Sequence, residues 1–167
     1  MRDLFAVVLA SASPRRFELL SSLGLNVEVV RSGYEETDID GLSPQQLAAT
    51  HARGKALAAA PAHPGSLVIG ADTVVDVDGT ALGKPASVAD AERMLRTLSG
   101  RDHIVHTAVC AVDAPAGGHL DLLSSARVRF YPLSDRQISD YARGPEAHDK
   151  AGAYGIQGRG ALLVERI

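Results

Sequence analysis

The sequence predicts an α/β fold built on a mixed β-sheet flanked by helices. Stretches with helical spacing and stretches with strand character alternate along the 167 residues, an order typical of α/β domains. Residues 66–85 hold two apolar stretches separated by Asp78–Gly79, a dipeptide typical of hairpin turns, so at least one pair of strands is antiparallel. The length suits one domain with its own core, and we expect residues 1–167 to form it.

The first half of the chain is predicted to form a strand, a helix, a second strand and a second helix, over residues 4–10, 14–23, 26–32 and 43–60. The short apolar run at 4–10 is typical of a buried strand. Both helices begin with Ser–Pro, a good N-cap followed by the residue best suited to the first helical position. Gly24 ends the first helix.

The second half is predicted to form two strands joined by a turn, a helix, two more strands and a last helix, over residues 66–85, 87–98, 103–113, 122–133 and 134–143. Ser134 and Gln137 have the spacing of a capping box at the start of the last helix. Cys110 lies in the middle of a predicted strand, so we expect it in the core. His103 and His106 fall on opposite faces of that strand, which makes them a poor zinc pair.

Composition argues against several classes of function. The net charge of −3 gives no global field for a polyanion, and aromatic residues, at 4% without tryptophan, are too scarce for a base-stacking surface. Nucleic acid is therefore not an expected partner. No apolar run approaches the length of a membrane span, so we expect no membrane association. A single cysteine fits a reducing compartment, and the apolar run before Ser11 is near the lower limit for a secretory signal. We expect a cytoplasmic protein.

Two arginines occupy the first turn of the first predicted helix. The positive end of a helix dipole disfavours cations by about 0.3–1 kcal/mol each, so stability of the helix alone does not explain Arg15 and Arg16. A phosphate at this N-terminus would contact the backbone N–H groups and the arginines together. Ion pairs with Glu18 and other surface carboxylates are an equally good interpretation of their position.

Asp72 lies inside an apolar stretch, where an ionised carboxylate is costly to bury unless a cation pairs with it. Two lysines are candidates for that cation. Lys84 precedes a proline, so its backbone is extended and its side chain can project from a loop. Lys55 shares a helical ridge with Leu47 and His51 and could face inward, although a solvated lysine on an alanine-rich helix is the commoner case.

Three further features are weak when each is taken alone. Glu35 and Glu36 follow the second predicted strand and suit either a polar loop or metal ligands. Residues 149–161 contain four glycines, which lets a backbone approach a ligand closely, but their order is not the dinucleotide-binding fingerprint. Tyr34 and Tyr154 suit either stacking on a base or packing in the core.

Taken together, these segments are specific. ASASPRR, EE, GADTVV, GKP, LSGRDH and DKAGAYGIQGRGAL occur in the order found in the Maf family, and the resemblance covers essentially the whole chain. DKAGAYGIQG is similar to the segment of the branch that acts on dTTP and UTP. The resemblance implies the fold of the inosine triphosphate pyrophosphatases, an elongated mixed sheet with two lobes and a cleft.

The same resemblance implies a reaction and its residues. The substrate would be a nucleoside triphosphate, dTTP or UTP, hydrolysed between the α- and β-phosphates with a divalent cation, Mg²⁺ or Mn²⁺, as cofactor. By matching motif positions, Asp72 is the implied proton acceptor, Lys55 and Lys84 are catalytic residues that hold phosphates, and Glu36 and Asp72 bind the metal. The implied substrate-binding and specificity residues are Ser13, Arg15, Arg16, Thr73 and Gln157.

Members of the family continue past the equivalent of ALLVERI with a strand and a terminal helix, whereas this sequence ends at Ile167. Either the sequence is incomplete or this single domain lacks that tail. A homodimer is compatible with the resemblance. The alternative function is a non-catalytic nucleotide- or nucleic-acid-binding regulator of septum formation and cell division. Asp72 together with both lysines favours the enzyme, because a pure binder needs no base.

Overall fold

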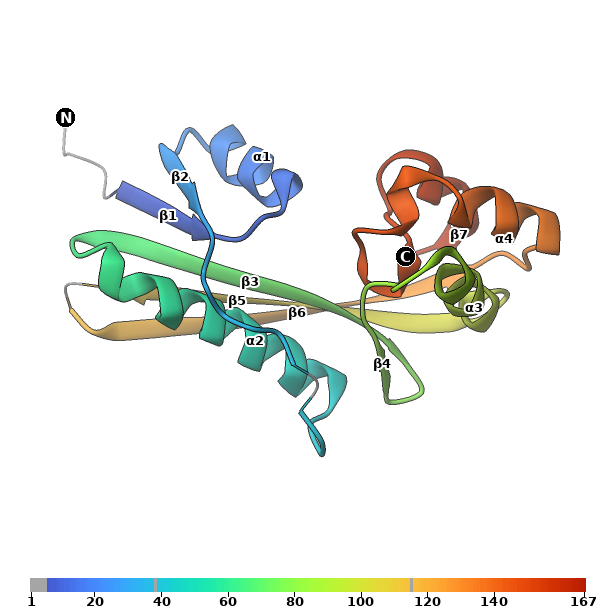
Figure 1. Ribbon diagram of the computed structural model, residues 1–167, viewed down its shortest axis with the longest axis horizontal. Coiled ribbons are helices and arrows are strands. Elements are labelled where there is room, and N and C mark those ends of the chain that lie inside the picture. The colour runs from blue at the N-terminus through green and yellow to red at the C-terminus, as the bar shows by residue number, and fades with distance from the viewer. Residues whose placement is uncertain (1–5, 38, 115) are drawn as a thin grey trace. The chain divides into compact units, whose positions relative to one another are not determined.

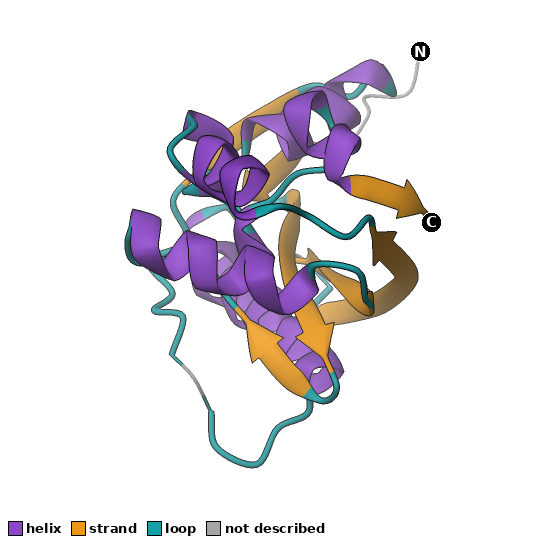
Figure 2. Cartoon of the chain, turned by 90° about the vertical axis from the view of Figure 1, so that its right-hand side faces the viewer, coloured by secondary structure: helices purple, strands orange, loops and turns teal. Residues whose placement is uncertain are grey.

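The computed structural model describes residues 6–37, 39–114 and 116–167 (Figure 1). The elements follow in the order β1 (Ala6–Ala10), α1 (Pro14–Ser22), β2 (Val27–Val30), α2 (Pro44–Ala59), β3 (Ser66–Val77), β4 (Thr80–Leu82), α3 (Val88–Leu98), β5 (Asp102–Asp113), β6 (Gly118–Phe130), α4 (Asp135–Ala142) and β7 (Val164–Arg166). Short 3-10 turns lie at Ala60–Ala62, Pro145–Ala147, Ala151–Ala153 and Gly158–Leu163. Helices and strands therefore interleave along the chain. Figure 2 shows the helices in purple and the strands in orange.

The strands of the described residues form one seven-stranded sheet in the order β2-β1-β3-β5-β6-β7, with β4 paired to β3. β1 runs parallel to both of its neighbours, β2 and β3. β4 is antiparallel to β3, and β7 is antiparallel to β6. The mixed sheet flanked by helices that the sequence predicts is confirmed.

The chain divides into two compact units. The first consists of residues up to Asp72 together with Thr107–Leu123, and the second of Thr73–His106 with Ser124–Ile167. The core of the first unit comes largely from β1, α2 and β3, with these buried side chains: Val7, Val8, Leu9, Leu47, Ala48, Ala52, Ala56 and Val68.

One glycine sets how near α2 lies to β3 in the first unit. A Cβ atom at Gly70 would overlap the carbonyl oxygen of Ala52 and lie 2.6 Å from the amide nitrogen of Ala56. Both are backbone atoms of the helix, so they cannot move aside as a flexible side chain would. Glycine at this position lets the helix pack directly on the strand, two residues before Asp72.

The second unit has its own core, which α3 and α4 cover. Its members include Val75, Leu82, Leu95, Leu98, Val128, Phe130, Ile138, Tyr141 and Tyr154. Asp78 and Gly79 both have positive φ, 52° and 83°, as a two-residue hairpin turn between β3 and β4 requires. The predicted hairpin is confirmed.

The predicted helices are confirmed to within one or two residues, including the capping box of Ser134 and Gln137. The first strand is confirmed over Ala6–Ala10, while residues 4 and 5 of the predicted range lie outside the described residues. None of the helices in the described ranges is long and apolar enough to cross a membrane.

Four strand predictions need correction. The strand predicted at 26–32 covers only Val27–Val30, and the returning strand of the hairpin ends at Leu82. β6 begins at Gly118 rather than 122 and ends before Pro132, which cannot donate a ladder hydrogen bond. Its residues 118–127 are exposed, so no pattern of burial marks where the strand starts. β7 was not predicted, because a three-residue strand is too short to carry a pattern.

Candidate active site

The N-terminus of α1 differs from that of α2 although both begin with Ser–Pro. Ser43 accepts a hydrogen bond from the Gln46 amide, and the Gln46 side chain accepts one from the Ser43 amide, which completes a capping box on α2. The side chain of Ser13 makes no capping hydrogen bond within the described part of the chain. Backbone N–H groups in the first turn of α1 are therefore without a side-chain cap and suit an anion.

Arg16, in that first turn, is held by the core of the first unit. Its Nη1 donates to the hydroxyl of Ser11 at 3.0 Å and to the carbonyl of Ala71 at 2.9 Å. Burial lowers the pKa of Arg16, while Asp72 and Glu36 raise it. An arginine stays protonated in proteins, so a fixed positive charge lies beside the end of β1. Ser11 and the Ala71 carbonyl were not predicted; a backbone carbonyl has no sequence signature.

Arg15 is half-buried. Across residues 6–37, 39–114 and 116–167, no carboxylate forms an ion pair with it. The surface ion pair with Glu18 that its position allowed is therefore not observed for Arg15. The guanidinium of Arg15 can therefore bind water or an anionic ligand.

Lys55 faces inward from α2 and is only 7% exposed. Its Nζ atom lies 2.6 Å from Asp72 Oδ1 and 2.7 Å from Glu36 Oε1. The ridge interpretation is correct, because His51 and Leu47 are buried on the same side of the helix. The interpretation of Lys55 as a solvated lysine is wrong.

Arg16, Glu36, Lys55 and Asp72 form what we name the charge cluster of the first unit. Asp72 is 7% exposed, so its carboxylate has lost most of its hydration, and such a group needs paired charge and hydrogen bonds. Lys55 supplies both, and this confirms that a lysine pairs with Asp72. One ammonium cannot neutralise two carboxylates, so Arg16 completes the balance at two positive and two negative charges.

The two carboxylates of the charge cluster fit a divalent cation. Glu36 and Asp72 contact the same Nζ atom, so the two carboxylates lie close together. Mg²⁺ is commonly held in proteins by one or two carboxylates together with substrate phosphates. No group of three or more His, Cys, Asp or Glu side chains that could hold a metal occurs among the described residues. A cation held partly by a phosphate is the kind of site that these residues suit.

The other predicted site residues belong to the second unit. Thr73 follows Asp72 directly on β3. Lys84 is exposed in the loop after β4, and within the described residues no hydrogen bond or ion pair to it is found. Gln157 is exposed at the start of the turn Gly158–Leu163. The roles of these three residues stay predictions.

The histidines set aside on sequence grounds serve the second unit's core and sheet. His103 Nε2 lies 2.7 Å from the Tyr154 hydroxyl, and its ring packs edge-on against Tyr154 and Phe130. Burial lowers the pKa of His103 to about 4, so this ring is neutral at pH 7. His106 bonds Ser125 instead. Tyr154 belongs to the core of the second unit, so the interpretation of this tyrosine as a packing residue is correct.

Cys110 is fully buried in β5, as predicted. Burial raises the pKa of its thiol to about 12. The thiolate is the reactive form of cysteine, so this thiol is inert at neutral pH and contributes no chemistry to the site.

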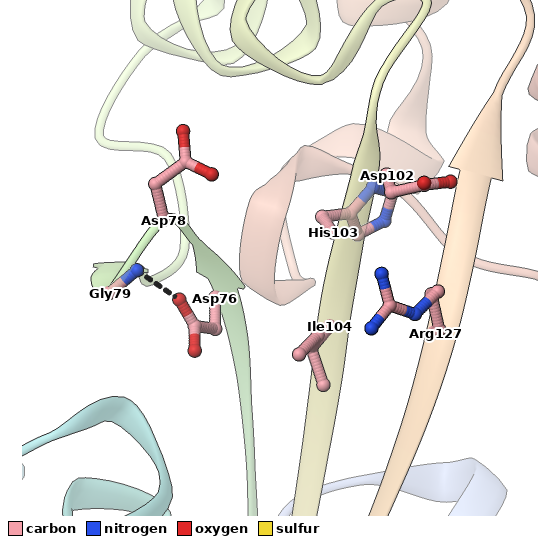
Figure 3. A pocket seen from close by; sticks show the side chains of 7 residues that line it. All are labelled: Asp76, Asp78, Gly79, Asp102, His103, Ile104 and Arg127. Carbon is pink, nitrogen blue, oxygen red and sulfur yellow. Dashed lines mark hydrogen bonds between the residues drawn. The ribbon is translucent and has the colours of Figure 1, made fainter.

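A cavity of about 230 Å³ lies in the second unit (Figure 3). It contains none of the predicted site residues, and its lining consists of Asp76, Asp78, Gly79, Asp102, His103, Ile104 and Arg127. Asp76 accepts a hydrogen bond from the Gly79 amide at 2.7 Å, which closes the hairpin turn. Asp78 pairs with Arg101. These carboxylates serve the turn between β3 and β4.

Comparison with known proteins gives the chain a family and relatives. A family model described as Maf-like protein matches residues 6–167. The dTTP/UTP pyrophosphatases of Carboxydothermus hydrogenoformans, Moorella thermoacetica and Deinococcus radiodurans are 44%, 48% and 46% identical to it. The alignments cover 96% of this chain and 86%, 83% and 81% of those proteins.

One solved structure is similar in fold. The Staphylococcus aureus Ham1 protein superposes with a TM-score of 0.54 at 18% identity, over 75% of this chain and 71% of that one. At this identity the likeness concerns the fold alone. It agrees with the inosine triphosphate pyrophosphatase-like fold implied by the sequence.

Proposed function

Because the chain belongs to the family of Maf-like proteins, we propose that it is a nucleoside triphosphate pyrophosphatase that hydrolyses dTTP and UTP. The products are the nucleoside monophosphate and pyrophosphate, and the role is house-cleaning of nucleotide pools in the cytoplasm. The observation that supports this most is the charge cluster, in which buried Lys55 bridges Asp72 and Glu36. Buried charges are costly to keep, and a phosphate substrate gives them a use.

The first unit offers the positive charge that a triphosphate requires. The protein as a whole carries a net charge of −3, so attraction must come from a local group of cations. Arg15, Arg16 and Lys55 supply it, together with the N–H groups at the start of α1. Lys84 of the second unit is proposed to hold a phosphate as well, on the strength of the family motif.

Asp72 is proposed as the proton acceptor. As the oxygen of a water molecule bonds to one phosphorus of the α–β anhydride, the bond from that phosphorus to the bridging oxygen breaks. The other phosphate product leaves with the bridging oxygen, and the water proton passes to the Asp72 carboxylate. Lys55 donates to Asp72 Oδ1, which fixes the orientation of the carboxylate. Phosphoryl transfer requires mainly such positioning and the neutralisation of charge.

Glu36 and Asp72 are the residues that would hold a divalent cation, Mg²⁺ or Mn²⁺. When bound, that ion neutralises charge on the phosphate oxygens. Arg16 and Lys55 contribute fixed charge on the protein side of the same cluster.

Selection of the base is proposed to rest on Arg15, Thr73 and Gln157, with Ser13 contributing to substrate binding. Uracil and thymine present an N3–H donor beside carbonyl acceptors, which a glutamine amide matches with its own acceptor and donors. Cytosine reverses this pattern and would leave both partners unpaired. We therefore expect CTP to be a poor substrate.

Release of pyrophosphate from dTTP, UTP, CTP and GTP tests the proposal, with the nucleotide product identified by chromatography. We expect dTMP or UMP with pyrophosphate, from dTTP and UTP in preference to CTP and GTP. A diphosphate with inorganic phosphate would contradict cleavage at the α–β bridge. A protein that binds dTTP without turnover would favour the regulator instead.

A further inference from the structure

The aromatic ring of Tyr34 packs on α2 next to the charge cluster. Tyr34 lies in the segment between β2 and α2, which has no regular secondary structure at residues 31–37. Its hydroxyl lies 3.1 Å from His51 Nδ1, and the two rings meet edge to face with their centroids 5.7 Å apart. A residue from a loop is thereby attached to a buried side chain of the helix.

Gly54 provides the place where the ring lies. A Cβ atom at this position would overlap Tyr34 Cε2 and lie 2.7 Å from Cδ2. Glycine in the interior of a helix costs roughly 0.5–1 kcal/mol relative to alanine. Glycine occurs at the helical turn where the tyrosine ring lies against the backbone, and its lack of a side chain makes room for the ring.

Tyr34 and Glu36 are bound to neighbouring positions of the same helix. Tyr34 contacts Gly54 and His51, and Glu36, two residues further along, contacts Lys55. The side chain of Glu36 is 43% exposed and that of Lys55 is 9% exposed, so their ion pair is open to solvent on the side of the glutamate. The partly buried contact of the Tyr34 ring with α2 restrains the same segment.

We propose that Tyr34, seated against Gly54 and bonded to His51, is a positioning residue that fixes the Glu36 carboxylate beside Lys55 for the divalent cation. This inference rests on the proposed function for the role of the cation. Tyr34 itself does not touch the reacting atoms. Its contribution is to remove conformational freedom of the loop before substrate and metal bind.

The contact itself is tested by thermal unfolding without nucleotide or metal. Gly54→Ala, Tyr34→Ala and the double variant are compared with the wild type. In the Tyr34→Ala background, Gly54→Ala raises Tm because alanine favours the helix. In the wild type, the same substitution displaces the ring, so the change in Tm is smaller or negative. Equal changes in Tm in both backgrounds would overturn the inference.

The positioning role is tested by Mn²⁺ binding, followed by electron paramagnetic resonance in the presence of a non-hydrolysable dTTP analogue. We expect Tyr34→Ala and Gly54→Ala to weaken Mn²⁺ binding about tenfold, as loss of a group that orients a metal ligand does. Tyr34→Phe, which keeps the ring, retains most of the affinity. The matched control is Tyr131→Ala, at a half-exposed tyrosine of the second unit, and it leaves Mn²⁺ affinity unchanged.

A second background separates positioning from general damage to the fold. If Tyr34 acts through Glu36, Tyr34→Ala causes no further loss of Mn²⁺ affinity in a Glu36→Gln protein. An additional loss of similar size in that background would overturn the inference. Failure of the wild type to release pyrophosphate would contradict the proposed function, while the Tm and Mn²⁺ measurements would still decide the role of Tyr34.

Discussion

Each unit buries a pair of titratable side chains, and the pair is charged in the first unit but neutral in the second. In the first unit, Lys55 and Asp72 are buried as an ion pair, with Nζ and Oδ1 2.6 Å apart. In the second unit, His103 and Tyr154 are buried as a hydrogen-bonded pair. Burial lowers the pKa of His103 to about 4 and raises the pKa of Tyr154, so both are neutral at pH 7.

The difference separates structure from function. The neutral pair of His103 and Tyr154 adds packing and one hydrogen bond to the core, while His103 Nδ1 has no hydrogen-bond partner among the described residues. A buried ion pair is often no more stabilising than apolar residues of the same size. The second unit therefore buries its titratable pair without charge, while the first unit retains buried charges that the fold alone does not require.

The largest expected effect is on turnover. Asp72→Asn removes the proposed proton acceptor, and we expect kcat for dTTP to fall by roughly 10²–10⁴. Binding of a non-hydrolysable analogue should stay within a few-fold, because the cations remain. Steady-state kinetics and calorimetry measure the two quantities. A variant with nearly wild-type kcat would exclude Asp72 as the base.

Next in size is the effect of removing the shared cation. Lys55→Met leaves the buried Asp72 carboxylate without its partner, which should lower the free energy of unfolding by about 3–5 kcal/mol. Urea denaturation at pH 7 measures the loss. Unchanged stability at pH 7 would mean that these charges are solvated.

The neutral pair predicts a pH dependence of stability. Unfolded His103 binds a proton below about pH 6.5, whereas the folded ring does so only near its pKa of about 4. The contribution of His103 to the free energy of unfolding is therefore fully present above pH 6.5. It falls by about 3 kcal/mol as the pH is lowered toward 4.

His103→Gln removes this titration, so the variant should lose less stability than the wild type between pH 6.5 and 4. Its kcat at pH 7 should stay near that of the wild type, since the residue belongs to the core of the second unit. Urea denaturation measures the free energy of unfolding of both proteins across this range. Equal losses in the wild type and the variant would show that folding does not lower the pKa of His103. A large loss of kcat would place it in the catalytic machinery.

The fold class could be predicted from the sequence because the strands and helices keep their periodic patterns. Asp78–Gly79 indicated the hairpin. The sequence also identified Asp72 as a carboxylate in need of a cation. It left the choice between Lys55 and Lys84 open, because that choice depends on how α2 packs over Gly70. Contacts such as Tyr34 on Gly54 and Arg16 on the Ala71 carbonyl join distant residues through shape or backbone, which no local pattern encodes.

The smallest effect on the free protein is also the most direct test that cations of the first unit serve a substrate rather than the fold. Arg15 opposes the dipole of α1, so Arg15→Ala should leave Tm of the free protein unchanged or slightly higher. With Mg²⁺ and a non-hydrolysable dTTP analogue, the wild type should gain stability through binding, and the variant should gain much less. Thermal unfolding with and without these ligands is the measurement. A lower Tm of the free variant, with the full ligand-induced gain retained, would show that Arg15 is structural and contradict the role proposed for it.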